Sequence, residues 1–305
     1  MAGAVIASAL ALTLLGVYLW VRVTRPGVES GRNAMPGRMV PLSQGLTHVQ
    51  WHGHDDAPVL VCVHGLSTPS FVWGPLLPFL TGLGYRVLTY DLYGRGYSDR
   101  VPGRQTEAFF LTQLQDLLQA EGVTGPVTLM GYSMGGAIST AFAAKHPGRV
   151  SRLILLAPAG LGLTLGRFSD FVTRAPVIGD WMIEVLGARL MRQSYRSGDA
   201  ADAVVDAITS RALDELTVAG TLRAILSAQR GILRDDQSGL HGSLAKRPVP
   251  ILAVWGSLDA AIPLGSRDRL AGVNPSARHI TLPDADHGLP YTHPARLAQE
   301  IGPPA

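Results

Sequence analysis

The sequence predicts an α/β protein whose mostly parallel sheet is covered by helices on both faces. Short apolar runs recur at 59–63, 86–90, 127–130, 153–156 and 251–255. They are continuous rather than alternating in polarity, as strands buried on both faces require. Segments with helical spacing separate them. With 305 residues, of which 47% are hydrophobic, the chain can bury a large core.

An uninterrupted apolar segment lies close to the N-terminus. Residues 2–21, AGAVIASALALTLLGVYLWV, include no charged side chain. At the rise of an α-helix this length spans about 30 Å, the thickness of the bilayer core. A cleavable signal peptide would have a basic start and small residues at its cleavage site, whereas Tyr18, Trp20 and Arg22 stand here. We expect an uncleaved, single-pass membrane anchor.

Basic residues predict the orientation of this anchor. No Lys or Arg precedes it, whereas Arg22, Arg25, Arg32 and Arg38 follow it. Because positive residues favour the cytoplasmic flank, we expect the main domain on the cytoplasmic side of the membrane.

The single cysteine, Cys62, excludes an intramolecular disulfide and lies in an apolar strand candidate, where it is expected to fill the core.

Composition divides the rest of the chain. Residues 22–45 are rich in Gly and Pro and have little apolar periodicity, which predicts a linker before a folded domain at 46–305. Residues 157–247 have no strong strand pattern but show helical spacing at Ile178, Trp181, Val185 and Ala188. They are expected to form a helical cap insertion over the sheet, with this apolar stripe used for packing.

The charge pattern excludes one class of partner. The net charge is +3, but the arginines are scattered and do not cluster with aromatic residues as a nucleic-acid groove requires. We therefore expect no nucleic-acid partner, and the sequence identifies no protein partner.

A serine between glycines follows the strand candidate at 127–130, in GYSMGG. In a parallel sheet, chemistry gathers at the carboxyl ends of strands. Gly131 and Gly135 would remove Cβ atoms that clash on a sharp turn from strand to helix. Such a turn exposes Ser133 and leaves the Met134 N–H near a helix N-terminus, where negative charge is stabilised. The strand before and the helix after favour a nucleophile over a turn serine.

A serine nucleophile needs a base and an acid that orients the base. His287, in LPDADHGLPYTHP, follows a short strand candidate and precedes a helical stretch, and Asp259, in ILAVWGSLDAAIP, follows another strand. The order Ser133, Asp259, His287 is the order of nucleophile, acid and histidine in one group of hydrolases.

Other acids and histidines near these positions have simpler interpretations. Asp284 and Asp286 are expected to be solvated turn residues, because neighbours on a tight loop rarely aim a carboxylate back at the ring. His293 is expected to begin the last helix, His146 to end one, and His64 to be structural.

Several separate stretches resemble the α/β-hydrolase family, over about residues 46–301. VLVCVHGL is similar to its His-Gly oxyanion turn, DLYGRGYSDR to a glycine-rich loop, GYSMGG to the nucleophile elbow, WGSLDAAIP to the acid loop and DHG to the histidine loop. The resemblance implies an oxyanion hole made by the backbone N–H groups of Leu66 and Met134. It also implies a serine esterase or lipase that needs neither metal nor organic cofactor.

Substrate is less sharply predicted. The anchor and the apolar cap residues Phe168, Phe171, Trp181 and Met182 favour a lipophilic acyl ester, in a layout similar to membrane-anchored monoacylglycerol lipases of this family. Hydrolysis of carbon–carbon bonds and cofactor-free perhydrolase chemistry use the same serine and remain alternatives, although HGLSTPS lacks the glycine-rich continuation expected for the former.

Two alternatives come from other classes of function. WHGHDDA, with His52, His54, Asp55 and Asp56, is similar to the metal-binding run of binuclear metallohydrolases. Ala57 replaces its last histidine, so a polar hairpin turn is expected instead. The other alternative is a non-catalytic ligand receptor, which the presence of all three triad residue types disfavours.

The glycine-rich loop adds two further expectations. Arg95 is expected to be structural, with contact to an anionic group as the alternative. Asp91 is expected to end its strand and brace the neighbouring loop.

Overall fold

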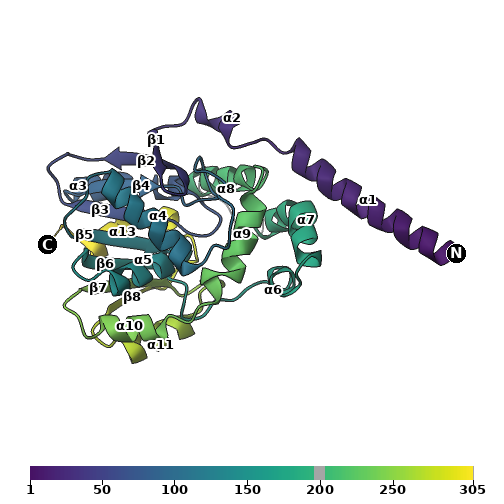
Figure 1. Ribbon diagram of the computed structural model, residues 1–305. Coiled ribbons are helices and arrows are strands. Elements are labelled where there is room, and N and C mark those ends of the chain that lie inside the picture. Colours follow the sequence, from purple (N-terminus) through teal and green to yellow (C-terminus); the bar gives the residue numbers. More distant parts are fainter. Residues whose placement is uncertain (196–202, 305) are drawn as a thin grey trace.

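An eight-stranded sheet forms the centre of the protein in the computed structural model, which describes residues 1–195 and 203–304 (Figure 1). Its strand order is β1-β2-β4-β3-β5-β6-β7-β8. The strands are β1 Arg38–Leu42, β2 Gly45–His52, β3 Val59–Val63, β4 Arg86–Tyr90, β5 Val127–Tyr132, β6 Val150–Leu156, β7 Ile251–Gly256 and β8 Arg278–Leu282.

The sheet is mostly parallel, as the sequence predicts. Strands β3 to β8 pair in parallel, and only β1 and β2 are antiparallel. All residues of β5 and β7 are buried, which explains their continuous apolar character. Because the strands at 59–63, 86–90, 127–130, 153–156 and 251–255 all occur, the predicted α/β class is confirmed.

The two antiparallel strands correct the expected domain boundary. β1 begins at Arg38, inside the stretch 22–45 that was expected to be a linker. It lies at the sheet edge, where a proline such as Pro41 is tolerated because that side of the strand needs no hydrogen-bond donor. The folded domain therefore begins before residue 46.

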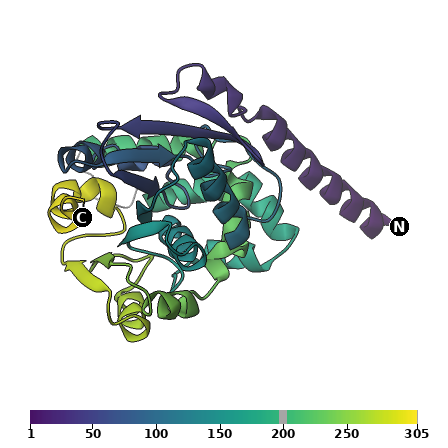
Figure 2. The same cartoon turned by 60° about the vertical axis from the view of Figure 1, so that its left-hand side comes forward.

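Helices cover both faces of the sheet (Figures 1 and 2). α4 and α10 contact α5 on one face, and α3 contacts α13 on the other. The helices of these layers are α3 Leu77–Gly82, α4 Glu107–Ala120, α5 Met134–Lys145, α10 Ser238–Leu244, α11 Leu264–Val273, α12 Leu289–Thr292 and α13 Pro294–Ile301. Two 3₁₀ turns precede helices of these layers: η1 Ser70–Trp73 lies before α3, and η2 Ile232–Arg234 lies before α10.

Four helices between β6 and β7 form a separate small layer, called the cap here. They are α6 Arg167–Arg174, α7 Ile178–Tyr195, α8 Ala203–Glu215 and α9 Thr221–Arg230. The cap has its own apolar cluster, which includes Val172, Ile183 and Leu222. The insertion expected at 157–247 is thus helical where it is described, but its last helix, α10, packs on α5. Residues 196–202 of this expected insertion lie outside the described residues.

The N-terminal helix α1, Ala2–Thr24, projects from the domain (Figure 1). None of its residues is buried. Within the described ranges, this is the one helix region long and apolar enough to cross a membrane, and signal sequences share these properties. α1 contacts α7 of the cap, and the short helix α2, Glu29–Arg32, follows it.

Candidate active site

Ser133 lies on a sharp turn between β5 and α5. Its backbone has φ 53° and ψ −118°, a strained conformation for a residue other than glycine. A Cβ at Gly131 would overlap the carbonyl oxygen of Gly135, and one at Gly135 would overlap the carbonyl oxygen of Val63. Both glycines are therefore required by close packing, as the sequence predicts, and the turn holds Ser133 at the carboxyl end of its strand.

The structure brings Ser133, His287 and Asp259 together. His287 Nε2 lies 3.0 Å from Ser133 Oγ, and His287 Nδ1 lies 2.7 Å from Asp259 Oδ2. The Asp259 side chain is fully buried, whereas that of His287 is 30% exposed. A hydroxyl can donate to one ring nitrogen while the other donates to the carboxylate, which is the geometry of an activated nucleophile.

Short hydrogen bonds fix both partners of the serine. Asp259 Oδ1 accepts from the backbone N–H groups of Ala261 and Ile262, each at 2.8 Å. The Tyr132 hydroxyl donates to the His287 carbonyl oxygen at 2.8 Å, and the two rings lie 5.2 Å apart. Tyr132 was not predicted to contribute. Its position directly before Ser133 was the available signal, but its partner is far away in the sequence.

The turn after β3 passes beside Ser133. A Cβ at Gly65 would lie 3.3 Å from Ser133 Cβ, so the backbone approaches closely. In the described part of the chain, neither the Leu66 nor the Met134 backbone N–H donates to a protein acceptor. Arg95 Nε donates to the Leu66 carbonyl oxygen at 3.0 Å and thereby orients this turn.

Arg95 has the structural role that was expected of it. Its side chain is fully buried. Besides Leu66, it donates to the carbonyl oxygens of Tyr93 and Ala224, which joins the glycine-rich loop to the cap helix α9.

A cavity of about 460 Å³ opens at Ser133 and His287. Its walls come from the turn after β3, the segment before α6, the start of α6, and α8. The cap contributes Ser169 and Thr209 to its lining, and Gly166, the N-cap residue of α6, lines it as well. The four apolar cap residues noted in the sequence do not line it: Phe168 and Met182 pack on the cap cluster, and Phe171 is half exposed.

The rival acids and histidines lie where the sequence predicts. Asp284 and Asp286 are exposed, and Asp286 accepts from the Gly288 N–H. His293 is the N-cap residue of α13, and His146 follows the last residue of α5. His64 is fully buried, and its Nε2 accepts from the Leu92 N–H at 2.9 Å.

The histidine-rich stretch WHGHDDA is a polar connection. Its first two residues end β2, whose partners are β1 and β4, so the expected hairpin with β3 is wrong. Asp55 pairs with Arg86 at 2.9 Å. No cluster of three His, Cys, Asp or Glu that could hold a metal ion occurs in residues 1–195 and 203–304.

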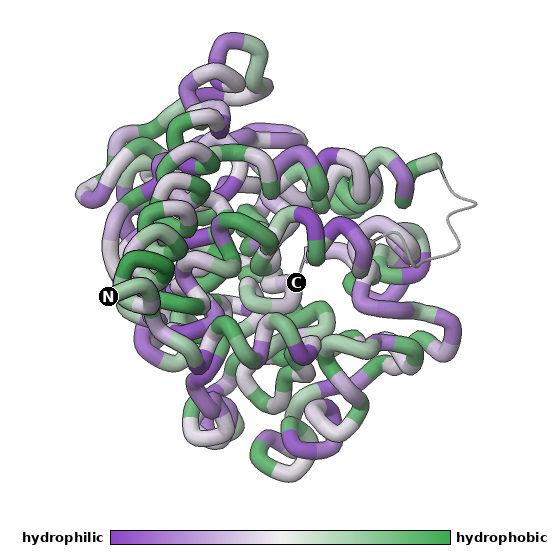
Figure 3. Tube along the Cα trace, turned by 90° about the vertical axis from the view of Figure 1, so that its right-hand side faces the viewer, coloured by the Kyte–Doolittle hydropathy of each residue, from purple (hydrophilic) through white to green (hydrophobic). Residues whose placement is uncertain are grey.

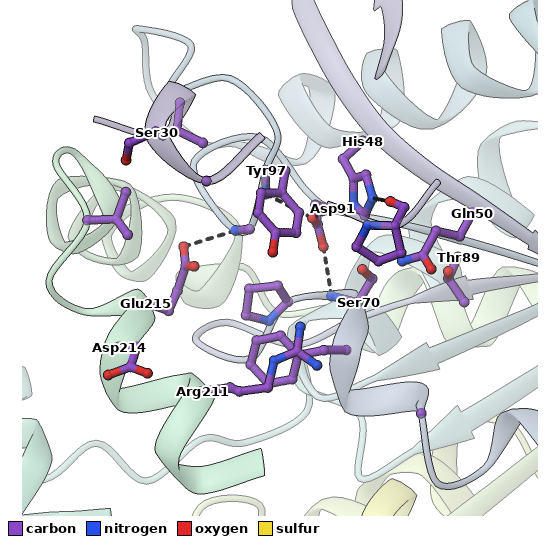
Figure 4. Close-up of a pocket in the computed structure, with 18 of the residues that line it drawn as sticks. Ser30, His48, Gln50, Ser70, Thr89, Asp91, Tyr97, Arg211, Asp214 and Glu215 are labelled. Carbon is purple, nitrogen blue, oxygen red and sulfur yellow. Dashed lines mark hydrogen bonds and ion pairs between the residues drawn. The ribbon is translucent and has the colours of Figure 1, made fainter. Parts of the chain in front are cut away.

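A second cavity, of about 470 Å³, lies between the segment at 26–36, η1 and the end of α8 (Figure 4). None of the three residues at the first site lines it. Its wall contains a second His–Asp pair, in which His48 Nδ1 lies 2.8 Å from Asp91 Oδ2. Asp91 also accepts from the N–H groups of Ser70 and Tyr97, so it braces the loop after β4 as expected.

Burial and hydrogen bonds act in opposite directions on this second pair. Burial lowers the pKa of His48, but the hydrogen bond and charge of Asp91 outweigh it, and the net pKa is raised. Burial likewise raises the pKa of Asp91, but the bonds from His48 and Ser70 hold it well below its usual range. The interaction between the two side chains therefore favours the charged form of each.

Glu215 of α8 lies beside this pair. It accepts from the Gly96 N–H and pairs with Arg100, each at 2.9 Å. Burial raises its pKa to about 7, against the opposing charge of Arg100.

Comparison with known proteins identifies the family. The profile of the family described as alpha/beta hydrolase fold matches residues 58–294. A pimeloyl-[acyl-carrier protein] methyl ester esterase of a Shewanella species is 26% identical over 274 residues, which cover 86% of this chain and 96% of that protein. The 2-hydroxy-6-oxo-6-(2'-aminophenyl)hexa-2,4-dienoic acid hydrolase of Metapseudomonas resinovorans is 24% identical over 228 residues, or 74% of this chain and 75% of that protein.

Solved structures show the same fold. The enol-lactonase of Burkholderia xenovorans LB400 superimposes with a TM-score of 0.74 at 20% identity, covering 87% of this chain and 98% of that one. A thermophilic esterase of Thermogutta terrifontis has a TM-score of 0.70 at 24% identity, covering 87% and 97%. The chain therefore belongs to the alpha/beta hydrolase fold family and is a hydrolase.

Proposed function

We propose that this hydrolase cleaves carboxylic esters through an acyl-enzyme on Ser133. The observation that supports this most is the hydrogen-bonded series Ser133 Oγ, His287 Nε2, His287 Nδ1 and Asp259 Oδ2, with distances of 3.0 and 2.7 Å. A relative named as an esterase, which this chain matches over 96% of that protein's length, also supports ester hydrolysis.

The proposed reaction has two halves. His287 Nε2 takes the proton of Ser133 as Oγ attacks the acyl carbonyl, and the resulting imidazolium is stabilised by Asp259. The imidazolium then gives that proton to the leaving alkoxide, which departs as the alcohol. In the second half His287 deprotonates a water molecule, which attacks the acyl-enzyme, releases the carboxylic acid and restores Ser133.

The tetrahedral intermediates carry a negative oxygen that needs donors. We assign this role to the backbone N–H groups of Leu66 and Met134, which have no protein acceptor in the described part of the chain. Each such donor contributes about 3 kcal/mol to transition-state stabilisation in comparable sites.

The proposed substrate is a lipophilic acyl ester presented at a membrane. α1 is the proposed single-pass anchor, with the hydrolase domain on the cytoplasmic side, because four arginines follow the apolar segment. An enzyme held at a bilayer meets esters that partition into lipid at high local concentration.

Covalent labelling tests the nucleophile. A fluorophosphonate should label the wild-type protein at Ser133, and Ser133→Ala should lose both labelling and hydrolysis of p-nitrophenyl esters. Ser139→Ala, in the helix that follows, is the control and should retain both. Labelling that persists in Ser133→Ala would refute the assignment.

A second candidate reaction is the cleavage of carbon–carbon bonds. It is favoured by the similarity to the dienoic acid hydrolase of Metapseudomonas resinovorans. The two reactions are distinguished by comparing kcat/KM for acyl glycerols of increasing chain length with kcat/KM for a 2-hydroxy-6-oxo-dienoic acid. A higher kcat/KM for the dienoic acid would replace the ester proposal while keeping the same three residues.

A further inference from the structure

An exposed apolar corner lies where α6 ends and α7 begins. Phe171, Val177 and Ile178, called the cap corner here, are 50%, 79% and 61% exposed. Exposed apolar side chains gathered at one place mark a surface for a partner rather than a random feature of the surface.

The cap corner is held firmly in this shape. Val177 has φ 66°, a left-handed conformation that is rare for a β-branched residue. Arg230 of α9 donates to the carbonyl oxygens of Val172 and Ala175 and pairs with Asp180 at 2.8 Å. The protein thus maintains a strained backbone that displays a valine to solvent. Such strain is typical of functional surfaces.

The contact between α7 and α1 indicates the depth of this corner. Trp181 Nε1 donates to the Leu14 carbonyl oxygen at 2.9 Å. Tyr18 and Trp20, near the end of the apolar segment, are residue types found at the bilayer interface. Leu14 precedes Val21 by seven residues (21 minus 14), which is about 10 Å along a helix. Trp181 therefore lies beside a part of α1 that would be inside the bilayer.

An ion pair forms a second contact between α7 and the chain at the C-terminal end of α1. Arg25, just beyond the apolar segment, pairs with Glu184 of α7 at 2.9 Å and donates to its carbonyl oxygen at 2.6 Å. Arg223 pairs with the same carboxylate at 2.8 Å, and the Glu184 side chain is only 2% exposed. Figure 1 shows α7 near the C-terminal part of α1 and α6 next to α7, and Figure 3 views this side of the molecule.

We infer that the cap corner enters the interface of a phospholipid bilayer beside α1. The inference rests on the proposed function of α1 as an anchor. Because α7 is fixed to α1 at two levels, insertion of α1 brings the corner to the lipid. The exposed pair Asp170–Arg174 flanks Phe171 on α6 and limits the corner to the interfacial zone, about 5–10 Å deep.

This position narrows the substrate class. α6 carries Phe171 on its outer side, while Ser169 of the same helix and its N-cap residue Gly166 line the cavity at Ser133. One helix thus separates the cavity from the lipid. Esters that reside in the bilayer are therefore the substrates that this arrangement favours.

Depth measurements test the inference on the full chain in phosphatidylcholine vesicles. An environment-sensitive fluorophore is attached at Ile178→Cys, and as a control at Phe79→Cys. Phe79 is also apolar and 40% exposed, but it lies on α3, on the side of the domain away from α1 (Figure 1). Cys62 is buried and does not compete for the label. Brominated acyl chains should quench the label at 178 at least twofold more than the label at 79.

The possible results separate the proposals. Equal quenching at 178 and 79 would overturn the cap-corner inference alone. Protein that does not float with the vesicles would overturn the anchor as well. Self-quenching between two labels at 178, without quenching by brominated lipid, would identify a second copy as the partner and also overturn the inference.

Kinetics provide an independent check. The double variant Phe171→Ser, Ile178→Ser should lose at least fivefold in hydrolysis of a long-chain ester in vesicles and keep its rate on a short soluble ester. Phe79→Ser should change neither. Equal losses on both substrates would indicate a structural role and contradict the inference. Failure of the ester proposal would appear differently, as no Ser133-dependent hydrolysis of any ester by the wild type.

Discussion

The histidine–aspartate pairs His287–Asp259 and His48–Asp91 differ in what the second ring nitrogen of the histidine meets. His287 lies 2.7 Å from Asp259 and presents Nε2 to a hydroxyl. His48 lies 2.8 Å from Asp91 and presents Nε2 to the carbonyl oxygen of Pro36 at 2.6 Å. The Pro36 carbonyl only accepts, so His48 Nε2 carries a proton, and the carboxylate of Asp91 favours a second proton on Nδ1. A hydroxyl can donate, so His287 can accept a proton. The same pair of residue types thus favours an ion pair in one place and can provide a base in the other.

The largest expected effect is on catalysis at the first pair. Asp259→Asn should lower kcat by about 10⁴-fold, because the amide no longer holds the productive tautomer of His287. The carbonyl of Asn can still accept from Ala261 and Ile262, so stability should change little. Steady-state kinetics and urea unfolding measure both quantities. Retention of more than a tenth of kcat would contradict the role given to Asp259.

The matched change at the second pair should act on stability. Asp91→Asn removes the negative charge that balances the buried His48 imidazolium. It also places the amide N–H₂ of asparagine against groups that themselves donate hydrogen bonds, such as the Ser70 and Tyr97 N–H groups. Breaking a buried pair in this way costs about 3–5 kcal/mol. We expect a lower urea midpoint, with the kcat of the remaining folded fraction nearly unchanged. An unchanged midpoint would mean that the second pair is not an ion pair.

Glu215, beside the second pair, should make stability depend on pH. Its pKa of about 7 in the folded state lies above its ordinary value of 4.5, so the folded state binds more protons between these values. Stability from this group is therefore complete below about pH 4.5 and is lost as pH rises through about 7, by roughly 3 kcal/mol. Glu215→Gln removes the dependence. The free energy of unfolding of the wild type minus that of the variant should therefore fall between pH 5 and pH 8. A difference that stays constant over this range would contradict a raised pKa of Glu215.

The smallest expected effect is on the loop that carries His287. Tyr132→Phe removes one hydrogen bond to the His287 carbonyl oxygen, worth about 1 kcal/mol, so kcat should fall by about five- to tenfold. The apolar packing of the ring is kept. A change in KM alone would indicate that Tyr132 acts on substrate binding rather than on His287.

Most of the sheet and the three residues at the first site could be predicted from local patterns. Strands buried on both faces have continuous apolar runs, and Ser133, Asp259 and His287 each follow such a run. β1 was missed because this edge strand is half exposed, and Arg38 and Pro41 weaken the pattern. Here tertiary pairing, not local preference, decides the structure.

Contacts between distant segments could not be predicted in the same way. His48 and Asp91 are 43 positions apart in the sequence, and neither lies in a motif that would predict their hydrogen bond. The bond from Trp181 to Leu14 spans 167 positions. The spacing at Ile178 and Trp181 did predict a helix, but not that Ile178 would be exposed and Trp181 would contact α1.

The segment that joins α1 to the sheet is fastened to the domain. Arg32 donates to the Tyr97 carbonyl oxygen and pairs with Asp99 at 2.6 Å, and the Pro26 carbonyl oxygen accepts from the Ala219 N–H at 2.9 Å. With α1 in a bilayer, these bonds set the height and tilt of Ser133 above the lipid. The enzyme would then have a short, fixed reach and would draw on esters diffusing laterally in its own leaflet rather than on those of a neighbouring membrane.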